Sequence, residues 1–283
     1  MSPIAVVLFG ANGQLGFELQ RALAPLGTVH AVTRAQADLR DAQAGLQLLE
    51  RLQPQVVVNA AAYTAVDKAE AEPELAQQIN AVTPGRYAQW CAENHRAMVH
   101  YSSDYVFDGA KTRAESYAEG DVPAPQGAYG RSKLAGEQAV MQSGCEHLVL
   151  RTSWVVGAHG GNFAKTMLRL ARERDTLRVV ADQWGAPTSA ALIADVTAHL
   201  LRAHLRGEGA GGLYHLAAAG VTNWCEYARF VIANARDMGL ATRATPDSVQ
   251  AITTADYPTP ARRPHNSRLD CSRLQSTFGL QLP

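Results

Sequence analysis

The feature that most constrains the fold is an apolar run, residues 4–9, that leads directly into a glycine-rich turn. Three glycines stand in this turn at intervals of three: Gly10, Gly13 and Gly16. A short, continuous apolar run rich in β-branched residues is typical of a strand covered on both faces in a parallel sheet. An amphipathic helix is predicted behind the turn, with its apolar positions on one face: Leu15, Leu19, Ala22 and Leu23.

Glycines between a buried strand and a helix point to a dinucleotide site. Without side chains, the backbone can approach a diphosphate, and the free N–H groups and dipole at the start of the helix hold its negative charge. A tight turn with close helix packing is the alternative.

The second strand ends in Arg34, and no Asp or Glu lies between Glu18 and Asp38. A guanidinium here suits a 2′-phosphate, so we predict a preference for NADPH over NADH; a solvated Arg34 is the alternative.

Further strand-like runs alternate with helical segments along the chain, which predicts a doubly wound parallel sheet. The runs cover residues 28–34, 55–61, 97–103, 147–157 and 212–218. Ligands of such sheets bind beyond the carboxyl ends of the strands. After residue 218 the pattern changes to a helix near 223–238 and an irregular stretch at 253–270. We therefore expect an α/β fold with two parts: a dinucleotide-binding Rossmann domain at residues 1–155 and about 188–218, and a smaller C-terminal substrate-binding lobe at about 156–187 and 219–283.

The charge balance and the cysteines argue against several classes of protein. Lys plus Arg and Asp plus Glu both number 26, which disfavours broad binding of nucleic acid or of an anionic membrane. The four cysteines lie far apart without C-x-x-C spacing, so we expect reduced thiols rather than a disulfide framework or a zinc site. The opening apolar run is too short for a membrane span and lacks the basic flank of a signal peptide, which predicts a cytoplasmic protein.

A second motif, AYGRSKLAGEQAV, opens a predicted helix and places Tyr129 and Lys133 four residues apart, on one face. A phenol beside an ammonium ion ionises more easily, so Tyr129 can serve as acid and base while Lys133 holds a cofactor ribose. Ser103 ends a buried strand at the same crevice, where its hydroxyl can hydrogen-bond a substrate carbonyl. The alternatives are a helix-surface contact for the pair, a capping role for the serine, and Ser102 in place of Ser103.

Together, the G-x-x-G-x-x-G turn, the strand-end serine and the Y-x-x-x-K motif resemble the extended short-chain dehydrogenase/reductases. Longer blocks over essentially all 283 residues are similar to the dTDP-4-dehydrorhamnose reductase family: NAAAYTAVDKAEAEPELA, HYSSDYVFDG, YGRSKLAGE, RTSWV, NFAKTMLRLA, DQWGAPT and YPTPARRPHNSRLD. The resemblance implies hydride transfer from NADPH or NADH to the 4-keto carbon of dTDP-6-deoxy-L-lyxo-4-hexulose, which gives dTDP-L-rhamnose.

The resemblance also implies catalytic roles. In this family, Tyr129 would protonate the developing alkoxide and Ser103 would polarise the ketone. Lys133 would lower the pKa of Tyr129 and hold the ribose. Asn80 matches the helix asparagine that many short-chain reductases use in a proton relay; a solvent-facing asparagine is the alternative.

Cofactor and substrate positions follow from the same resemblance. The cofactor positions are Gly10, Asn12, Gly13, Gln14, Leu15 and Gly16 at the diphosphate, Arg34, Asp38 and Leu39 on the adenine side, and Ala60, Ala61, Ala62 and Thr64 on the nicotinamide side, with Tyr129 and Lys133. The substrate positions are Thr64, Ser103, Asp104, Tyr105, Tyr129 and Trp154, with Arg262 and Arg263 at the substrate diphosphate. Packing in the core is the alternative for Trp154, and carbonyl contacts at the surface are the alternative for the two arginines.

Two departures from the family's pattern bear on metal binding and assembly. The family typically continues past Leu282 and Pro283 into a further helix. Some members place Mg²⁺ at a dimer interface with carboxylates partly from that helix, and this sequence has Leu15 where they can carry Glu. We therefore expect no bound metal, and a monomer or a homodimer.

Two other functions compete with the reductase. An epimerase or dehydratase of the same superfamily needs a further acid/base pair near the strand-end serine, and no Asp-Glu pair follows Ser103. A regulatory subunit similar to that of methionine adenosyltransferase binds a dinucleotide without reducing a sugar. The intact set of Ser103, Tyr129 and Lys133 weighs against that second function.

Overall fold

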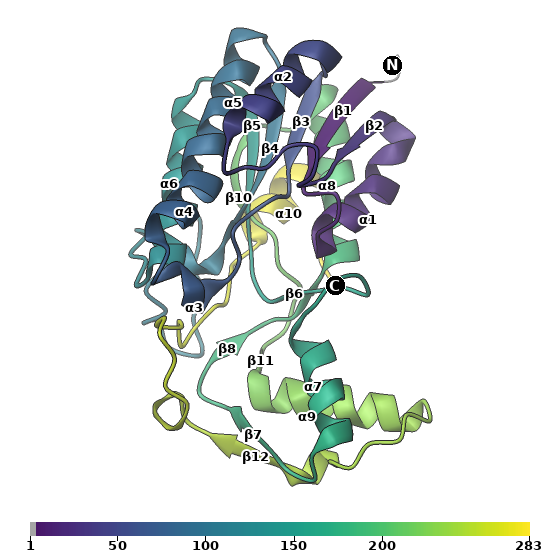
Figure 1. Ribbon diagram of the computed structural model, residues 1–283, viewed down its shortest axis with the longest axis vertical. Coiled ribbons are helices and arrows are strands. Elements are labelled where there is room, and N and C mark those ends of the chain that lie inside the picture. The colour runs from purple at the N-terminus through teal and green to yellow at the C-terminus, as the bar shows by residue number, and fades with distance from the viewer. Residues whose placement is uncertain (1–3) are drawn as a thin grey trace.

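Six parallel strands form the central sheet of the large domain in the computed structural model, which describes residues 4–283 (Figure 1). In chain order the strands are β1 (Ile4–Phe9), β2 (Gly27–Val32), β3 (Val56–Asn59), β4 (Ala97–Ser103), β5 (Glu146–Thr152) and β10 (Gly212–His215). Their spatial order is β10-β5-β4-β3-β1-β2. Because β1 pairs with both β2 and β3, strands are added in opposite directions from this point, where doubly wound sheets bind ligands. The predicted α/β fold is confirmed.

Helices cover both faces of this sheet. One face carries α1 (Gln14–Leu23) and α8 (Ala190–Leu205), and the other carries α2 (Ala42–Leu52), α5 (Thr83–Glu93) and α6 (Ala128–Gln142). Successive side chains of a strand point to opposite faces. Val6 and Leu8 therefore pack with Leu19 of α1, whereas Phe9 stacks on Tyr87 of α5 with ring centroids 4.6 Å apart. Burial on both faces explains why the β1 sequence is apolar throughout.

Shorter segments of the large domain connect these layers. They are η1 (Ala24–Leu26), α3 (Val66–Ala69), α4 (Pro73–Gln77), the π-helical turn η2 (Gln78–Val82) and η3 (Asp104–Val106).

A smaller lobe lies below the sheet in Figure 1 and has an apolar core of its own. Its main elements are α7 (Phe163–Glu173), β7 (Leu177–Val180), α9 (Trp224–Asp237) and β12 (Val249–Ile252). Met167 and Ala171 of α7 pack with Ile232 of α9 and Val249 of β12, which pairs in parallel with β7. The remaining elements are β6 (Val155–Val156), β8 (Trp184–Gly185), β9 (Thr188–Ser189), β11 (Thr222–Asn223), η4 (Pro246–Ser248) and η5 (Thr254–Asp256).

Two segments differ from the sequence-based expectation. The strand predicted at 147–157 is two strands, because Trp154 has a φ of 47° and β6 pairs with β9 outside the central sheet. The C-terminal helix α10 (Ser272–Phe278) packs Leu274 and Phe278 into the core of the large domain, against Tyr214 of β10. Residues 219–283 therefore do not all belong to the smaller lobe; the other domain boundaries stay a prediction, and residues 1–3 lie outside the described part.

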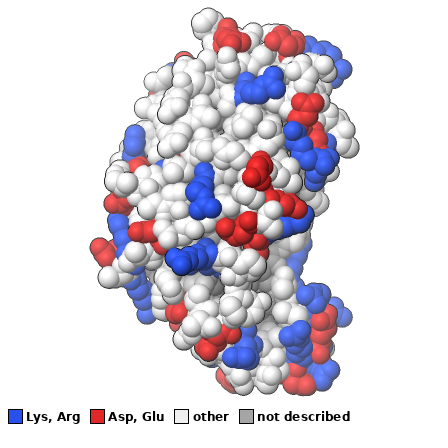
Figure 2. All heavy atoms as spheres, turned by 60° about the vertical axis from the view of Figure 1, so that its left-hand side comes forward, with Lys and Arg blue, Asp and Glu red and all other residues white. Residues whose placement is uncertain are grey.

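Charged side chains of both signs are interspersed over the face drawn in Figure 2, in keeping with equal numbers of acidic and basic residues. None of the helices within residues 4–283 combines the length and the apolar composition that crossing a membrane requires.

Candidate active site

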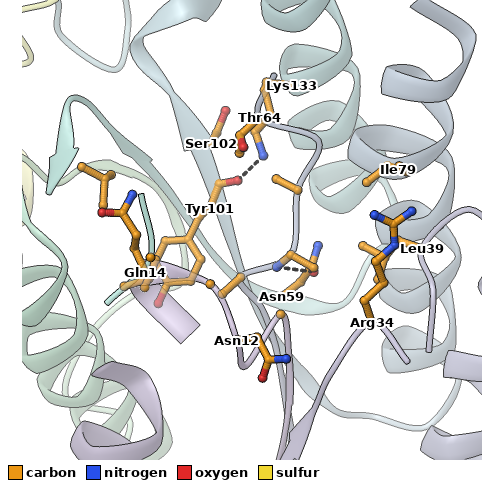
Figure 3. Close-up of a pocket in the computed structure, with 18 of the residues that line it drawn as sticks. Asn12, Gln14, Arg34, Leu39, Asn59, Thr64, Ile79, Tyr101, Ser102 and Lys133 are labelled. Carbon is orange, nitrogen blue, oxygen red and sulfur yellow. Dashed lines mark hydrogen bonds between the residues drawn. The ribbon is translucent and has the colours of Figure 1, made fainter. Parts of the chain in front are cut away.

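A cavity of about 550 Å³ opens at the carboxyl ends of β1 and β3, within the size range of ligand pockets (Figure 3). Every predicted cofactor residue except Gly16 lines it: Gly10, Asn12, Gly13, Gln14, Leu15, Arg34, Asp38, Leu39, Ala60, Ala61, Ala62, Thr64, Tyr129 and Lys133. In Figure 3, Gln14 lies on one side of the cavity and Arg34 with Leu39 on the other. The switch point of the sheet therefore carries a cavity that extends from Gln14 to Arg34.

The glycine turn fits the close approach of a ligand to the backbone. Gly10 has a φ of 81°, and a Cβ added there would stand 2.6 Å from the nitrogen of Ala61. Gly13 is the N-cap of α1 and offers no side chain to satisfy the first helical N–H groups. These donors and the helix dipole are left for an anion. Gly16 does not line the cavity. It packs behind the turn, where an added Cβ would overlap the carbonyl oxygen of Gly10.

Two buried hydroxyls also indicate a polar ligand. Ser102 Oγ and Thr152 Oγ1 both belong to residues that line the cavity, and neither has a hydrogen-bond partner within the described chain. Buried polar groups nearly always find a partner, so a bound dinucleotide or water is expected to supply it. The donor set, the open helix end and these hydroxyls together fit a dinucleotide.

Arg34 reaches the cavity from the end of β2 and is tied to a carboxylate. Its Nε donates to Asp38 Oδ2 over 3.0 Å, and Arg40 Nη2 lies 2.7 Å from the same oxygen. Burial alone would raise the pKa of Asp38, but the hydrogen bonds from Arg40 and Arg34 outweigh it and lower that pKa to about 2. Asp38 is therefore ionised and binds the guanidinium groups of Arg34 and Arg40.

The predicted acid and lysine both lie on α6, where Lys133 is buried and Tyr129 is partly buried. Burial and the Asp104 carboxylate raise the pKa of Tyr129 to about 12, against the opposing effect of the Ser103 hydroxyl. Lys133 Nζ donates to the carbonyl oxygen of Tyr101 over 2.6 Å, and burial lowers its pKa to about 8 (Figure 3). Burial dominates the pKa of Tyr129, and the ammonium of Lys133 is bonded to the Tyr101 carbonyl. That Lys133 lowers the pKa of Tyr129 stays a prediction.

The end of β4 brings three predicted residues next to Tyr129. Ser103 Oγ donates to Asp104 Oδ1 over 2.9 Å and accepts from the nitrogen of Tyr105 over 3.2 Å. Burial raises the pKa of Asp104 to about 6, although hydrogen bonds from Ser267 and Ser103 favour the carboxylate. The ring of Tyr105 meets that of Tyr129 edge-on at 5.3 Å. Ser102 lines the cavity. Ser103 does not line it, and its hydroxyl lies next to Asp104 and the phenol of Tyr129.

Asn80 is buried in the π-helical turn η2 and does not face solvent. Its Oδ1 accepts from the nitrogen of Tyr63 over 2.8 Å, and its Nδ2 donates to Ser132 Oγ over 2.9 Å. Ser132 Oγ in turn donates to the carbonyl oxygen of Tyr129 over 2.7 Å. The side chain of Asn80 therefore ties the Tyr63 loop to the first turn of α6.

The remaining substrate candidates lie outside the cavity. Trp154 stacks on Trp224 of the smaller lobe with ring centroids 3.5 Å apart. Arg262 is exposed, whereas Arg263 is partly buried and forms two hydrogen bonds with Asp67. These residues lie where the two lobes meet, apart from the residues that line the dinucleotide cavity.

Comparison with known proteins places this architecture in a family. Residues 4–283 match the family model described as the RmlD substrate binding domain. The dTDP-4-dehydrorhamnose reductase of Escherichia coli strain K12 is 48% identical over 282 residues, which cover 98% of this chain and 93% of the relative. The chain belongs to the dTDP-4-dehydrorhamnose reductase family. The enzyme of that name from Burkholderia thailandensis is 45% identical over 98% of this chain and 94% of its own length.

A crystal structure from the same family supports the fold in detail. The dTDP-4-dehydrorhamnose reductase of Bacillus anthracis, solved in complex with NADP, superimposes with a TM-score of 0.90 at 34% identity and covers 99% of this chain and 95% of that one.

Sequence reasoning missed one part of this reductase-family site. Gly160 and Gly161 line the cavity from the segment that follows β6. This segment crosses the glycine turn, because His159 Nε2 lies 3.0 Å from the carbonyl oxygen of Asn12 and Asn162 Nδ2 donates to Gln14 Oε1 over 2.9 Å. The glycine-rich sequence GAHGG at residues 157–161, at the end of a predicted strand, is the pattern that could have indicated this segment. The cavity also includes Ala37, Asn59, Ile79, Tyr101, Ser102, Thr152 and Val155.

Metal ligands do not cluster in the described chain. Among residues 4–283, three or more His, Cys, Asp or Glu side chains nowhere come together in a way that could hold a metal ion.

Proposed function

We propose that the chain catalyses the NADPH-dependent reduction of the 4-keto group of dTDP-6-deoxy-L-lyxo-4-hexulose to dTDP-L-rhamnose. The observation that carries the proposal is one cavity that joins the glycine turn after β1 to Tyr129 and Lys133 of α6. The named relatives, 48% and 45% identical over 98% of this chain, support the same reaction.

The cavity lining supports an assignment for each part of the cofactor. Residues 10–15 would bind the diphosphate, Arg34 would bind the 2′-phosphate, and Ala60 to Thr64 would lie beside the nicotinamide. The NADP bound to the Bacillus anthracis relative supports this choice. When bound, NADPH supplies the hydride that reduces the ketone.

Tyr129 is assigned as the general acid. With its pKa raised to about 12, the phenol is protonated at neutral pH and can give a proton to the alkoxide that hydride transfer creates. Ser103, beside the phenol, would donate to the same oxygen, where negative charge develops in the transition state. Its hydroxyl hydrogen must then leave Asp104 for the substrate.

Lys133 is assigned to the cofactor ribose. An ammonium group has three donors, and the Tyr101 carbonyl takes one of them. The other two remain for the ribose hydroxyls at the floor of the cavity. Asn80 supports this arrangement from behind, because it fixes the Tyr63 loop and, through Ser132, the turn that carries Tyr129.

The dTDP-sugar would bind where the lobes meet. Thr64, Asp104, Tyr105 and Trp154 would surround the sugar, and Arg262 with Arg263 would bind the diphosphate. The exposed Arg262 and the partly buried Arg263 both lie on the irregular segment that returns from the smaller lobe.

The proposal is tested by incubating the protein with NADPH and the dTDP-4-keto sugar and identifying the product by NMR. Sugar-dependent oxidation of NADPH with formation of the rhamno isomer is expected. An epimerised sugar without net NADPH oxidation would indicate the epimerase alternative. Tight NADPH binding without turnover would indicate the regulatory alternative.

A further inference from the structure

Asp67 forms a two-pronged ion pair with Arg263 across 196 residues of sequence. Arg263 Nη1 donates to Asp67 Oδ1 over 3.0 Å, and Nη2 donates to Oδ2 over 2.7 Å. The nitrogen of Ala261 donates to Oδ1 as well, over 3.3 Å. Asp67 belongs to α3 of the large domain, and in Figure 1 the chain that leaves β12 runs back past this helix. One carboxylate therefore holds the returning segment at two points.

The bonds of Arg263 leave one edge of its guanidinium open. Nη1 has two hydrogens, and these go to Asp67 Oδ1 and to Thr259 Oγ1, the latter over 2.6 Å. Nη2 donates one of its two hydrogens to Asp67 Oδ2. Within the described chain, Nε–H and the second Nη2–H have no acceptor. These two donors form the side-on fork of an arginine, which matches two oxygens of a phosphate.

The surroundings place this fork beside the reaction site. The charges of Arg263 and Tyr105 act on each other's pKa, and Tyr105 meets Tyr129 edge-on at 5.3 Å. α3 also touches the catalytic helix, because Glu70 Oε1 accepts from the nitrogen of Ala128 over 2.7 Å. The side chain of Arg263 remains 27% exposed, so a ligand can reach it.

We propose that Asp67 is a positioning residue that fixes Arg263 with its open edge toward the diphosphate of the sugar nucleotide. The inference rests on the proposed function, since it takes the dTDP-sugar as the ligand. The carboxylate occupies the end-on fork and Thr259 takes the remaining Nη1 hydrogen, so the guanidinium cannot rotate and only its side-on fork faces the ligand.

The test measures binding of dTDP and of thymidine to the Asp67→Asn variant loaded with NADP. Asparagine offers one acceptor and one donor, so it keeps one hydrogen bond to Arg263 and places an N–H group against the other guanidinium N–H. We expect the Kd for dTDP to rise about tenfold while the Kd for thymidine changes less than twofold. In turnover, KM for the dTDP-sugar should rise by a similar factor, with kcat and the KM for NADPH nearly unchanged.

A matched control removes an equivalent ion pair elsewhere. Within the smaller lobe, Arg243 donates to Asp175 through Nε over 3.0 Å and through Nη2 over 2.7 Å. Asp175→Asn should leave dTDP binding unchanged, and thermal unfolding of both variants checks that they fold. A second variant, Arg263→Lys, keeps the charge but lacks the fork, so it should weaken dTDP binding as well.

Different failures have different meanings. Unchanged or tighter dTDP binding by a folded Asp67→Asn variant contradicts the positioning role, and tighter binding would mean that Asp67 competes with the anion. Wild-type protein that binds dTDP no better than thymidine overturns diphosphate recognition altogether. Wild-type protein that binds dTDP in this Asp67-dependent way but does not reduce the 4-keto sugar contradicts the proposed function alone.

Discussion

Burial decides the protonation of the groups that meet at the reaction site. Desolvation raises the pKa of Tyr129 to about 12 and that of Asp104 to about 6, and it lowers the pKa of Lys133 to about 8. At neutral pH the phenol is therefore protonated and the carboxyl is mostly ionised. A protonated phenol suits a step in which a ketone becomes an alcohol, because that step consumes a proton.

The titration of Asp104 predicts a pH-dependent stability. Because its pKa rises from 3.8 to about 6 on folding, the folded protein holds this proton more tightly than the unfolded chain. The protonated Asp104 therefore contributes to the free energy of unfolding in full below pH 4, and this contribution is lost as the pH rises through 6. Relative to wild type, Asp104→Asn should gain up to roughly 3 kcal/mol of unfolding free energy between pH 4 and pH 7. Urea denaturation at both pH values measures this gain; a difference independent of pH contradicts the assigned pKa.

Arg34 carries the prediction of cofactor preference. Its guanidinium lines the cavity and is held by Asp38, ready to meet a 2′-phosphate. Arg34→Asp should lower the ratio of kcat/KM for NADPH to that for NADH at least tenfold, since a charge-assisted hydrogen bond contributes about 1.5–3 kcal/mol. Arg40→Ala is the control, because Arg40 binds Asp38 without lining the cavity. An unchanged ratio of the two kcat/KM values in Arg34→Asp would contradict the assignment of Arg34 to the 2′-phosphate.

At the scale of elements, local pattern predicts the strand, turn and helix that border the cavity. The turn after β1 and the helix behind it follow from glycines and apolar periodicity within residues 4–23, and β1 and β4 have the predicted bounds or lie within them. The break at Trp154 had no such signal, since the apolar run continues through β6. Its cause is a positive φ and pairing with β9, which only the tertiary structure supplies.

The glycine turn predicts a difference between two substitutions. Gly10 and Gly144 both have a φ of 81°, so alanine strains the backbone at either position by roughly 1 kcal/mol. At Gly10 the new Cβ would also stand 2.6 Å from the nitrogen of Ala61, whereas at Gly144 nothing lies within 4 Å. Gly10→Ala should therefore weaken NADPH binding by more than tenfold, measured by cofactor fluorescence, while Gly144→Ala leaves it unchanged. Equal effects would count against the role of Gly10.

At the scale of the whole molecule, contacts between distant parts of the chain join the two lobes. Asp67 and Arg263 meet across the lobe boundary, and His159 lies over Asn12 of the glycine turn. The sequence names Asn12 and Arg263 as candidate site residues, but it has no local signal for their partners His159 and Asp67, which lie far away along the chain. The substrate half of the site, and the return of α10 to the large domain, were for this reason beyond prediction from periodicity.

The packing of α10 predicts where stability depends on the C-terminal segment. Phe278 is 8% exposed and meets Tyr214 in the core of the large domain, whereas Phe230 of α9 is 63% exposed. Phe278→Ala should lower the free energy of unfolding by about 3 kcal/mol, and Phe230→Ala by less than about 0.5 kcal/mol. Thermal and urea unfolding compare them. If the free energy of unfolding fell by a similar small amount in both variants, α10 would not be part of the cooperatively folded core.

The measurement that tests the central claim most directly is the rate of NADPH oxidation with dTDP-6-deoxy-L-lyxo-4-hexulose by wild type and Tyr129→Phe, side by side. Phenylalanine keeps the ring but removes the proton donor, and positioned proton transfer contributes about 10²–10⁴ in rate. We predict turnover by the wild type and at least a hundredfold lower kcat in the variant at saturating NADPH. Equal rates in the two proteins would contradict the assignment of Tyr129 as the acid, and no turnover by cofactor-bound wild type would contradict the reductase itself.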